Sequence, residues 1–341
     1  METSRDSYQQ VQIHSENENL TTKPWKIMQR QVLVSSAVWS SFFTLGLLFG
    51  TPTVYIAQRR REENSTEAIS IEMASWISSA HTYSAIPFFF IMAALSKHFG
   101  RKKTYLIACS TSFIGFMTIY LSTSVIEILI GECILGALLA CDFIICGMVL
   151  TEYTSSKYRG FFLTFKSATF AWGILVANLI GIFIDWRPIA LLACICSAYS
   201  FIVGLTWPES PYWLISNKDY NACSESHYWL KGKNEESKRE LKELIKAHQE
   251  LIEVKIERTR QHPIVKLIKN LISKTFYRPF TYSILMASLY YFSGKMACNV
   301  YAIQIIKSVI DNDSVANTGT LIVDAVCVIK TKDKTIVEIS R

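Results

Sequence analysis

The stretch KHFGRKK, residues 97–103, places four Lys or Arg side chains and a histidine between two long apolar runs. The run before it, 73–96, and the run after it, 104–126, contain no Asp, Glu, Lys or Arg. Each run exceeds the roughly 20 residues that a helix needs to cross the hydrocarbon core of a bilayer. A basic turn between two such runs predicts two membrane-spanning helices that are joined in the cytoplasm.

The same pattern continues in both directions along the chain. Of 341 residues, 50% are hydrophobic and 18% are charged, below the quarter that is usual in soluble domains. Runs this long favour helices over barrel strands, which need about ten alternating residues. The sequence therefore predicts an all-α membrane protein with seven full helices and a short eighth. The predicted runs are 32–56, 73–96, 104–126, 128–151, 160–184, 188–207, 280–306 and 315–329.

Lys and Arg residues gather on one side of these runs. The polar segment 208–280 alone holds 14 Lys or Arg against 10 Asp or Glu. The positive-inside rule then places the N-terminus and this segment in the cytoplasm, with the cell membrane as the expected location. The net charge of +7 reports this topology and indicates no nucleic-acid partner. Asn64-Ser65-Thr66 is an N-glycosylation sequon on the outer side, which makes the chain an expected glycoprotein.

The polar segment carries an amphipathic helix of its own. From Glu235 to Arg260, apolar residues recur at helical spacing, and glutamates and lysines fill the other face. We favour a solvated helix that lies against the inner ends of the bundle. A calmodulin-binding or membrane-surface helix is the alternative.

Three short motifs stand where predicted helices meet the cytoplasm. They are GRKK (100–103), the pair Glu152 and Arg159 that flanks the fourth turn, and PESPYWL (208–214). Acidic and basic groups at helix ends can form a charge network that holds one conformation closed and releases it in another. We predict such an inner gate from Arg101, Glu152, Arg159 and Glu209.

In this order and spacing, the three motifs resemble those of the sugar porter family of the major facilitator superfamily, especially insect trehalose- and glucose-type facilitators. Gly46, Gly50, Pro52 and Gly173 agree with that resemblance, which covers roughly residues 25–329. It implies a major facilitator-type helical bundle of two six-helix halves, with a central site between them. The implied function is facilitative transport of a small-molecule sugar, such as trehalose or glucose, by alternating access across the lipid bilayer.

The resemblance divides the chain into five parts. The family's second half would continue for roughly four helices beyond residue 329. We therefore expect a truncated gene model, a splice variant or a naturally shortened protein. The parts are a cytoplasmic N-terminal segment (1–31), the six-helix N-terminal half (32–207), a cytoplasmic helical loop (208–280), the start of the second half with helix 7 and a partial helix 8 (281–329) and an atypical polar tail (330–341).

The positions that hold sugar in the family carry other residues here. The glutamine of the fifth helix aligns with Ser167, the paired glutamines of the seventh with Tyr290 and Tyr291, and Tyr301 falls on the family's Ser-Gly…Tyr pattern. These four are the candidate substrate-binding residues. A sugar is held by many hydrogen bonds from its hydroxyls to amides, so the loss of the amides weakens the expected binding. A non-transporting sensor or interaction protein derived from a sugar transporter is therefore the alternative function.

Ionisable residues also lie inside the predicted spans, where charges are costly and by default suggest function. Glu132 is expected near the outer surface, and Lys166 is expected to reach toward the cytoplasm. Asp142 and Lys166 lie within about one turn of the same depth when counted from the inner helix ends. We predict that these two form an ion pair, with proton coupling through Asp142 as a further possibility. Lys295 and Asp324 are the remaining intramembrane charges.

Enzymatic chemistry has no recognisable pattern in these spans. Paired carboxylates, a histidine cluster and nucleophile–base spacing do not stand out. The nine cysteines lie mostly in apolar runs and show no metal-ligand spacing with histidine, so no metal or cofactor is expected. A seven-helix receptor is a third class, which the cytoplasmic N-terminus disfavours.

Overall fold

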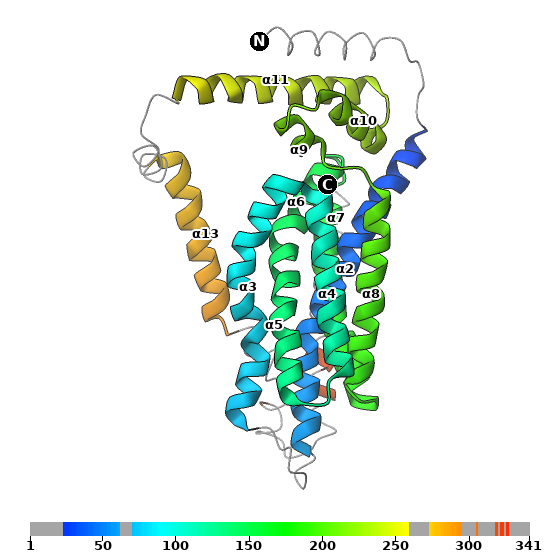
Figure 1. Ribbon diagram of the computed structural model, residues 1–341, viewed down its shortest axis with the longest axis vertical. Helices are drawn as coiled ribbons and strands as arrows, with labels where there is room; N and C mark the ends of the chain where they lie inside the picture. Colours follow the sequence, from blue (N-terminus) through cyan, green and yellow to red (C-terminus); the bar gives the residue numbers. More distant parts are fainter. Residues whose placement is uncertain are drawn as a thin grey trace.

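The computed structural model describes residues 23–61, 70–258 and 273–294, together with isolated positions between 305 and 326. All elements formed by these residues are helices, and six spans are long and apolar enough to cross a membrane. The six spans stand side by side as a bundle (Figure 1). They are α2 (Pro24–Arg61), α3 (Ile71–Phe99), α4 (Arg101–Leu121), the combined span of α5 (Val125–Cys141), η1 (Asp142–Cys146) and α6 (Gly147–Tyr153), α7 (Arg159–Phe183) and α8 (Arg187–Thr206).

These spans confirm the six-helix N-terminal half that the apolar runs predict, and local signals explain where the helices begin. Ser70 caps α3 by accepting a hydrogen bond from the Met73 amide. Ser124 and Glu127 form a reciprocal capping box at the start of α5. Gly100 separates α3 from α4 with a φ of 93°, a conformation that other residues adopt only under strain.

The fourth span is interrupted by the π-helical turn η1, which the sequence did not predict. Residues 142–146 are apolar except for Asp142, so hydropathy shows no interruption of the span at these residues. Single π-helical turns inside α-helices are rare and often occur at functional sites. The turn therefore indicates a candidate functional site around Asp142.

Close packing between α2 and α7 depends on two glycines. A Cβ added to Gly46 would lie 2.3 Å from the Phe170 carbonyl oxygen, and one added to Gly173 would lie 2.3 Å from that of Phe43. Because both contacts are with backbone atoms, neither neighbour can move aside without separating the helices. The glycines therefore bring the side chains around Phe42 and Phe170 into contact across this seam.

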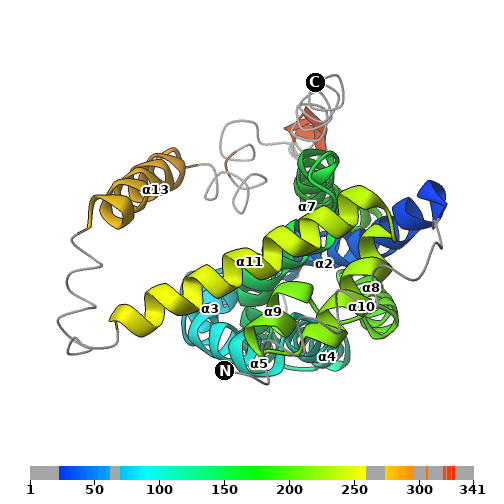
Figure 2. The same cartoon turned by 90° about the horizontal axis from the view of Figure 1, so that it is seen from above.

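Three further helices cover one end of the bundle, which we call the loop end. They are α9 (Pro211–Ser216), α10 (Tyr220–Lys231) and α11 (Glu235–Arg258), and α11 crosses above the bundle (Figure 2). Leu241 and Ile245 of α11 are buried against α9 and α10. This is the favoured arrangement, a helix lying against the ends of the bundle, and its apolar residues as far as Ile245 pack on α9 and α10.

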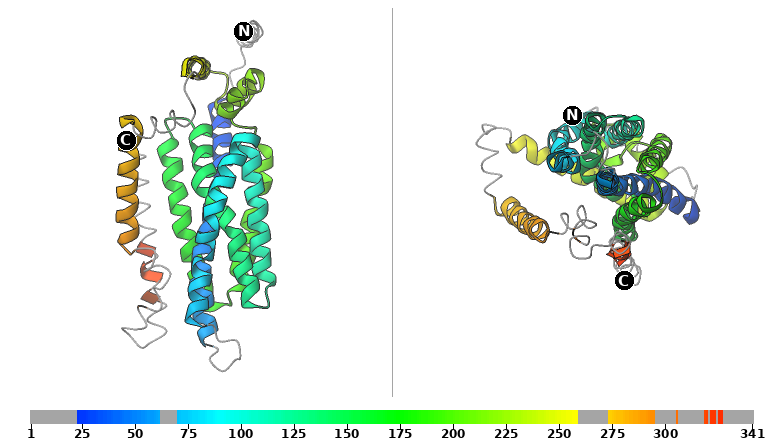
Figure 3. Two further views of the ribbon diagram at one scale, coloured as in Figure 1. Left: turned by 60° about the vertical axis from the view of Figure 1, so that its left-hand side comes forward. Right: turned by 90° about the horizontal axis from the view of Figure 1, so that it is seen from below.

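Helix α13 (Lys274–Phe292) stands apart from the bundle, on the side flanked by α3 and α7 (Figure 3). Its bounds differ from the predicted run 280–306. The helix starts earlier because polar residues from Lys274 onward can continue a helix that hydropathy does not detect. It ends at Phe292, shortly before Gly294 with a φ of 71°, and the residues from 295 to 304 lie outside the described part.

Candidate functional site

At the loop end, Arg101 and Glu152 form the centre of a charge network. Arg101 opens α4, and Glu152 lies in the last turn of α6. The Arg101 Nε and Nη2 atoms each donate to a different Glu152 carboxylate oxygen at 3.2 Å. Such paired, charge-assisted bonds fix the orientation of both side chains as well as their separation.

Glu209 joins the network through the backbone of α4 rather than through the Arg101 side chain. Its Oε1 atom accepts from the backbone amides of Arg101 at 2.8 Å and Lys102 at 2.9 Å. These amides are unpaired donors at a helix N-terminus, where a carboxylate is favourable. A Cβ on Gly100 would lie 2.4 Å from Glu209 Oε2, so glycine also provides the room for this contact.

The PESPYWL motif is bonded to the other two motifs. The Ser210 hydroxyl donates to Glu152 Oε2, and the Tyr153 hydroxyl donates to the Pro208 carbonyl at 3.0 Å. Trp213 Nε1 donates to the Lys97 carbonyl at 3.0 Å. The three motifs that are far apart in the sequence therefore form one bonded cluster.

The prediction that Arg159 joins this network does not hold in the structure. No ion pair links Arg159 to another residue of the described part, and its Nε atom is buried without a hydrogen-bond partner. Arg159 opens α7, and its charge acts on Tyr212, whose pKa is raised by burial and lowered in part by this arginine. Spacing in the sequence predicts the position of Arg159 at the start of its helix correctly. It does not determine whether the side chain reaches the cluster.

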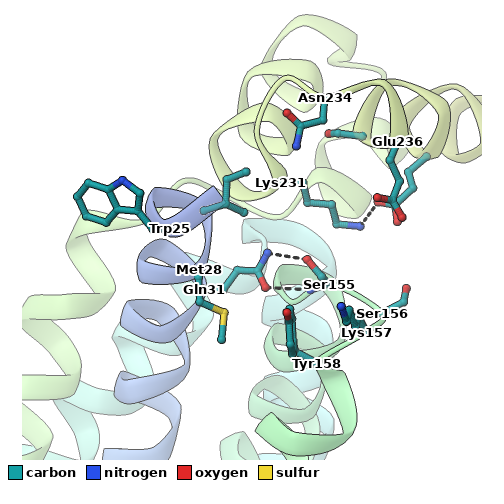
Figure 4. A pocket seen from close by; sticks show the side chains of 13 residues that line it. Trp25, Met28, Gln31, Ser155, Ser156, Lys157, Tyr158, Lys231, Asn234 and Glu236 are labelled. Atoms are coloured by element: carbon teal, nitrogen blue, oxygen red, sulfur yellow. Dashed lines mark hydrogen bonds and ion pairs between the residues drawn. The ribbon is translucent and has the colours of Figure 1, made fainter. Parts of the chain in front are cut away.

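Beside this network, a pocket of about 510 Å³ lies between the start of α2, the α6–α7 connection and the α10–α11 turn (Figure 4). Gln31 spans it, donating to Ser155 Oγ at 2.8 Å and accepting from the Ser155 amide at 3.1 Å. Lys231 and Glu240 form an ion pair at 2.5 Å on its other wall. Gln31 also donates to the Leu230 carbonyl at 3.3 Å, and Arg30 donates to the Trp229 carbonyl at 2.8 Å. These two bonds attach α10 to the bundle, and the sequence did not predict them.

Asp142 lies in the interior of the bundle, with 0% of its surface exposed. Its Oδ1 atom accepts from Ser41 Oγ at 2.6 Å and from Cys146 Sγ at 3.1 Å, while Oδ2 has no hydrogen-bond partner. The Cys146 contact lies within the π-helical turn, which thus supplies one local donor to Asp142.

The predicted ion pair between Asp142 and Lys166 is wrong. The Lys166 ammonium lies 4.3 Å from the centre of the Phe42 ring, and no ion pair joins it to an acid of the described chain. Asp142 contacts Ser41, and Lys166 contacts the adjacent Phe42, so the two charges do share a depth. They contact neighbouring residues of α2, Ser41 and Phe42, which project about 100° apart around the helix, and no ion pair forms between them.

A buried pair that the sequence did not predict joins α3 to α5. His81 Nδ1 lies 3.0 Å from Glu132 Oε2, and each residue is 1% exposed. Glu132 was expected near the outer surface, and it lies about two turns from the start of α5, at the end opposite the loop end. The sequence did not show that its side chain is buried, with His81 as its partner. The signal was present in the sequence as one histidine in an otherwise uncharged run, but spacing could not pair it with an acid 51 residues later.

The remaining candidate residues are only partly described. Ser167 is exposed on α7, next to Lys166. Tyr290 and Tyr291 belong to α13, and the positions of their side chains fall outside the described part. Asn64, Lys295, Tyr301 and Asp324 also lie outside the described residues.

The bundle has the fold of solved carriers of the major facilitator superfamily. The xylose transporter XylE from E. coli, in a partially occluded inward-open conformation, matches with a TM-score of 0.65 at 17% identity, over 89% of this chain and 71% of that chain. The proton:xylose symporter XylE bound to 6-bromo-6-deoxy-D-glucose gives 0.66 at 19% identity, over 89% and 69%. At these identities, the likeness establishes a major facilitator-type helical bundle and nothing finer.

Sequence relatives define the family. The profile described as "Sugar (and other) transporter" matches residues 60–331, most of the chain, so the chain belongs to this family of multi-pass membrane proteins. The facilitated trehalose transporter Tret1 of Apis mellifera ligustica is 28% identical over 323 residues, 94% of this chain and 62% of the relative. Tret1 of Culex quinquefasciatus is 25% identical over 305 residues, 88% and 56%. The chain thus spans about three fifths of the length of these relatives.

Proposed function

We propose that this protein is a carrier that moves a sugar, such as trehalose or glucose, across a membrane down its concentration gradient. The observation that carries the proposal is the family membership together with the bonded cluster of all three motifs at the loop end. Relatives named as trehalose transporters favour this function over a non-transporting sensor, and no enzymatic step is proposed.

The loop-end network suits the inner gate of an alternating-access cycle. Arg101, Glu152 and Glu209 connect α4, α6 and the segment before α9 through bonds that are only partly shielded from water. Partly hydrated ion pairs contribute modest free energy each, so a conformational change can exchange them. In this role, the network stabilises one arrangement of the inner helix ends and breaks when they separate.

The proposal also includes a membrane topology. We place the loop end in the cytoplasm, the N-terminus with it, and the chain in the cell membrane, since Lys and Arg concentrate at that end. Asn64 would then be glycosylated on the outside. Glycosidase treatment of wild type and of Asn64→Gln tests this placement, because only wild type should shift in mobility.

Uptake of radiolabelled trehalose and glucose into cells that express the protein tests the function. One arm uses this chain, and a second arm extends it with the C-terminal part of the honeybee relative. Both are compared with Glu152→Gln, which removes one charge of the network. We expect saturable uptake that Glu152→Gln slows, and absence of uptake from both arms contradicts the proposal.

A further inference from the structure

One face of the bundle is lined by partly exposed aromatic side chains, which we call the aromatic wall. Phe49 contacts Phe170 with ring centres 5.6 Å apart, and Phe89 contacts Phe143 at 6.3 Å. Trp39 contacts Phe165 at 4.4 Å. The wall consists of Trp39, Phe42 and Phe49 of α2, Phe89 of α3, Phe143 of η1, and Phe165 and Phe170 of α7.

Lys166 is the cation of this wall. Its ammonium lies over the Phe42 ring, and it makes no hydrogen bond or ion pair with any residue that the structure describes. Trp39 contacts Phe162, one turn closer to the loop end, and Gly46 contacts Phe170, one turn further away. Because the ammonium lies over Phe42, it is at about the same depth in the bundle as the backbone of Lys166. The side chain therefore does not extend toward the loop end.

An unpaired cation at this depth is costly, and a ring contact offsets only part of that cost. The charge of Lys166 acts on Asp142, but no ion pair joins the two, and both nearby acids are hydrogen-bonded to other groups of the described chain. Asp142 bonds to Ser41 and Cys146 in the bundle interior, and Glu132 bonds to His81. Lys166 therefore offers an open position for an anion on the wall.

Helix α13, the first helix of the second half, stands on the side of the bundle flanked by α3 and α7, two of the helices that contribute to the wall (Figure 2). The wall offers rings for stacking and a single charge, and Ser167 is the exposed neighbour of Lys166 on α7. Aromatic faces stack on sugar rings, whereas one ammonium bonds best to a carboxylate. The combination matches a sugar that carries one acidic group better than a neutral sugar.

We propose that Lys166 binds the carboxylate of an acidic sugar of the hexuronate class, whose ring packs on the aromatic wall. This inference rests on the proposed carrier function and narrows its substrate. A neutral hexose would make the ring contacts and leave the ammonium without a partner. Lys166 is therefore the residue that determines specificity.

Calorimetric titration of the purified protein in nanodiscs tests this assignment with ligands matched in shape. D-glucuronate and D-glucose differ in the carboxylate at C6, and acetate supplies the carboxylate without the ring. The proteins are wild type, Lys166→Gln, Lys166→Arg and Lys242→Gln, which removes an exposed lysine of α11 as a control.

We expect wild type to bind glucuronate about tenfold more tightly than glucose or acetate, since one charge-assisted bond is worth about that factor. Lys166→Gln should abolish the preference, whereas Lys166→Arg and Lys242→Gln should keep it. Equal binding of glucuronate and glucose, equal binding of glucuronate and acetate, failure of wild type to bind glucuronate, or a preference that survives Lys166→Gln would each overturn the inference.

Uptake measured in parallel separates this inference from the carrier function. Uptake of glucose or trehalose without any preference for glucuronate would leave the carrier intact and refute the role of Lys166. Preferential binding of glucuronate without uptake of any sugar would support the role of Lys166 and refute the carrier.

Discussion

Charged side chains have several partners at the loop end and few in the middle of the bundle. At the loop end, Glu152 bonds to both Arg101 and Ser210, and Glu209 accepts from several backbone amides. In the middle, His81 and Glu132 have only each other, and Asp142 has no cation partner in the described chain. Partly hydrated groups at the loop end have several partners that can be exchanged, whereas the buried His81–Glu132 pair depends on a single contact.

The largest expected effect is the loss of one member of the isolated pair. His81→Leu leaves Glu132 buried without a partner, which should destabilise the protein by about 3–5 kcal/mol. The double variant His81→Leu, Glu132→Leu should regain most of this loss because no charge remains. Thermal unfolding in detergent measures both variants, and a double variant as unstable as the single one would show that the pair is not the cause.

Breaking the loop-end network should cost less. Arg101→Met removes two bonds to Glu152 and one to the Ser96 carbonyl, but Glu152 keeps Ser210 and the site is partly hydrated, so we expect a loss of about 1–3 kcal/mol. Lys103→Met, an exposed neighbour in the same motif, serves as the control and should unfold like wild type. A loss for Arg101→Met that matches that of His81→Leu would remove the contrast between the two regions.

Acidification should weaken the loop end through His227 of α10. Burial, aided by the charge of Lys231, lowers the pKa of His227 to about 4, and its Nε2 lies 3.0 Å from the Ser237 carbonyl. Below the unfolded pKa of 6.5, the unfolded chain binds a proton that the native side chain does not, so stability falls from about pH 6.5 toward pH 4. Between pH 7 and pH 5 the expected loss is about 2 kcal/mol.

His227→Gln checks this source of the pH dependence. Glutamine can donate to the same carbonyl but does not titrate, so its melting temperature should fall less than that of wild type between pH 7 and pH 5. Identical pH profiles for the two proteins would assign the dependence to other groups.

The smallest effect is expected at Asp142. Asp142→Asn keeps an oxygen that can accept from Ser41 and Cys146, and no cation partner is lost, so stability should change by less than about 1 kcal/mol. Unfolding in detergent measures it beside His81→Leu. A change as large as that of His81→Leu would indicate an ionised Asp142 with a partner that the geometry does not show.

The sequence predicted the six spans well because apolar length is a local property that the bilayer imposes on every helix. It also predicted that Arg101, Glu152 and Glu209 gather at one end, since helix ends on the same side of a membrane meet there. The direction in which a side chain points around its helix could not be predicted in the same way. Whether Lys166 turns toward Asp142 or Phe42 depends on which side of α2 each neighbour packs, and spacing along one helix does not contain that information.

The same limit explains the two polar features that sequence reasoning missed. His81 and Glu132 are separated by 51 residues and meet only because α3 packs on α5. The π-helical turn has ordinary apolar residues, and its extra residue is accommodated by tertiary packing rather than by any local signal. Glu209 was found as an acid near the gate, but its role as a cap of α4 required the positions of backbone amides.

The turn at Asp142–Cys146 also changes how this span corresponds to those of other proteins. A π-helical turn takes up one residue more than the α-helical turn it replaces. In a relative whose span is α-helical throughout, the residue that matches Glu132 by counting back from Glu152 points about 100° away from it. The structural counterpart of such a residue is Gly131, so Glu132 does not replace the residue that counting assigns to it, and aligning this span with an uninterrupted one requires a one-residue gap.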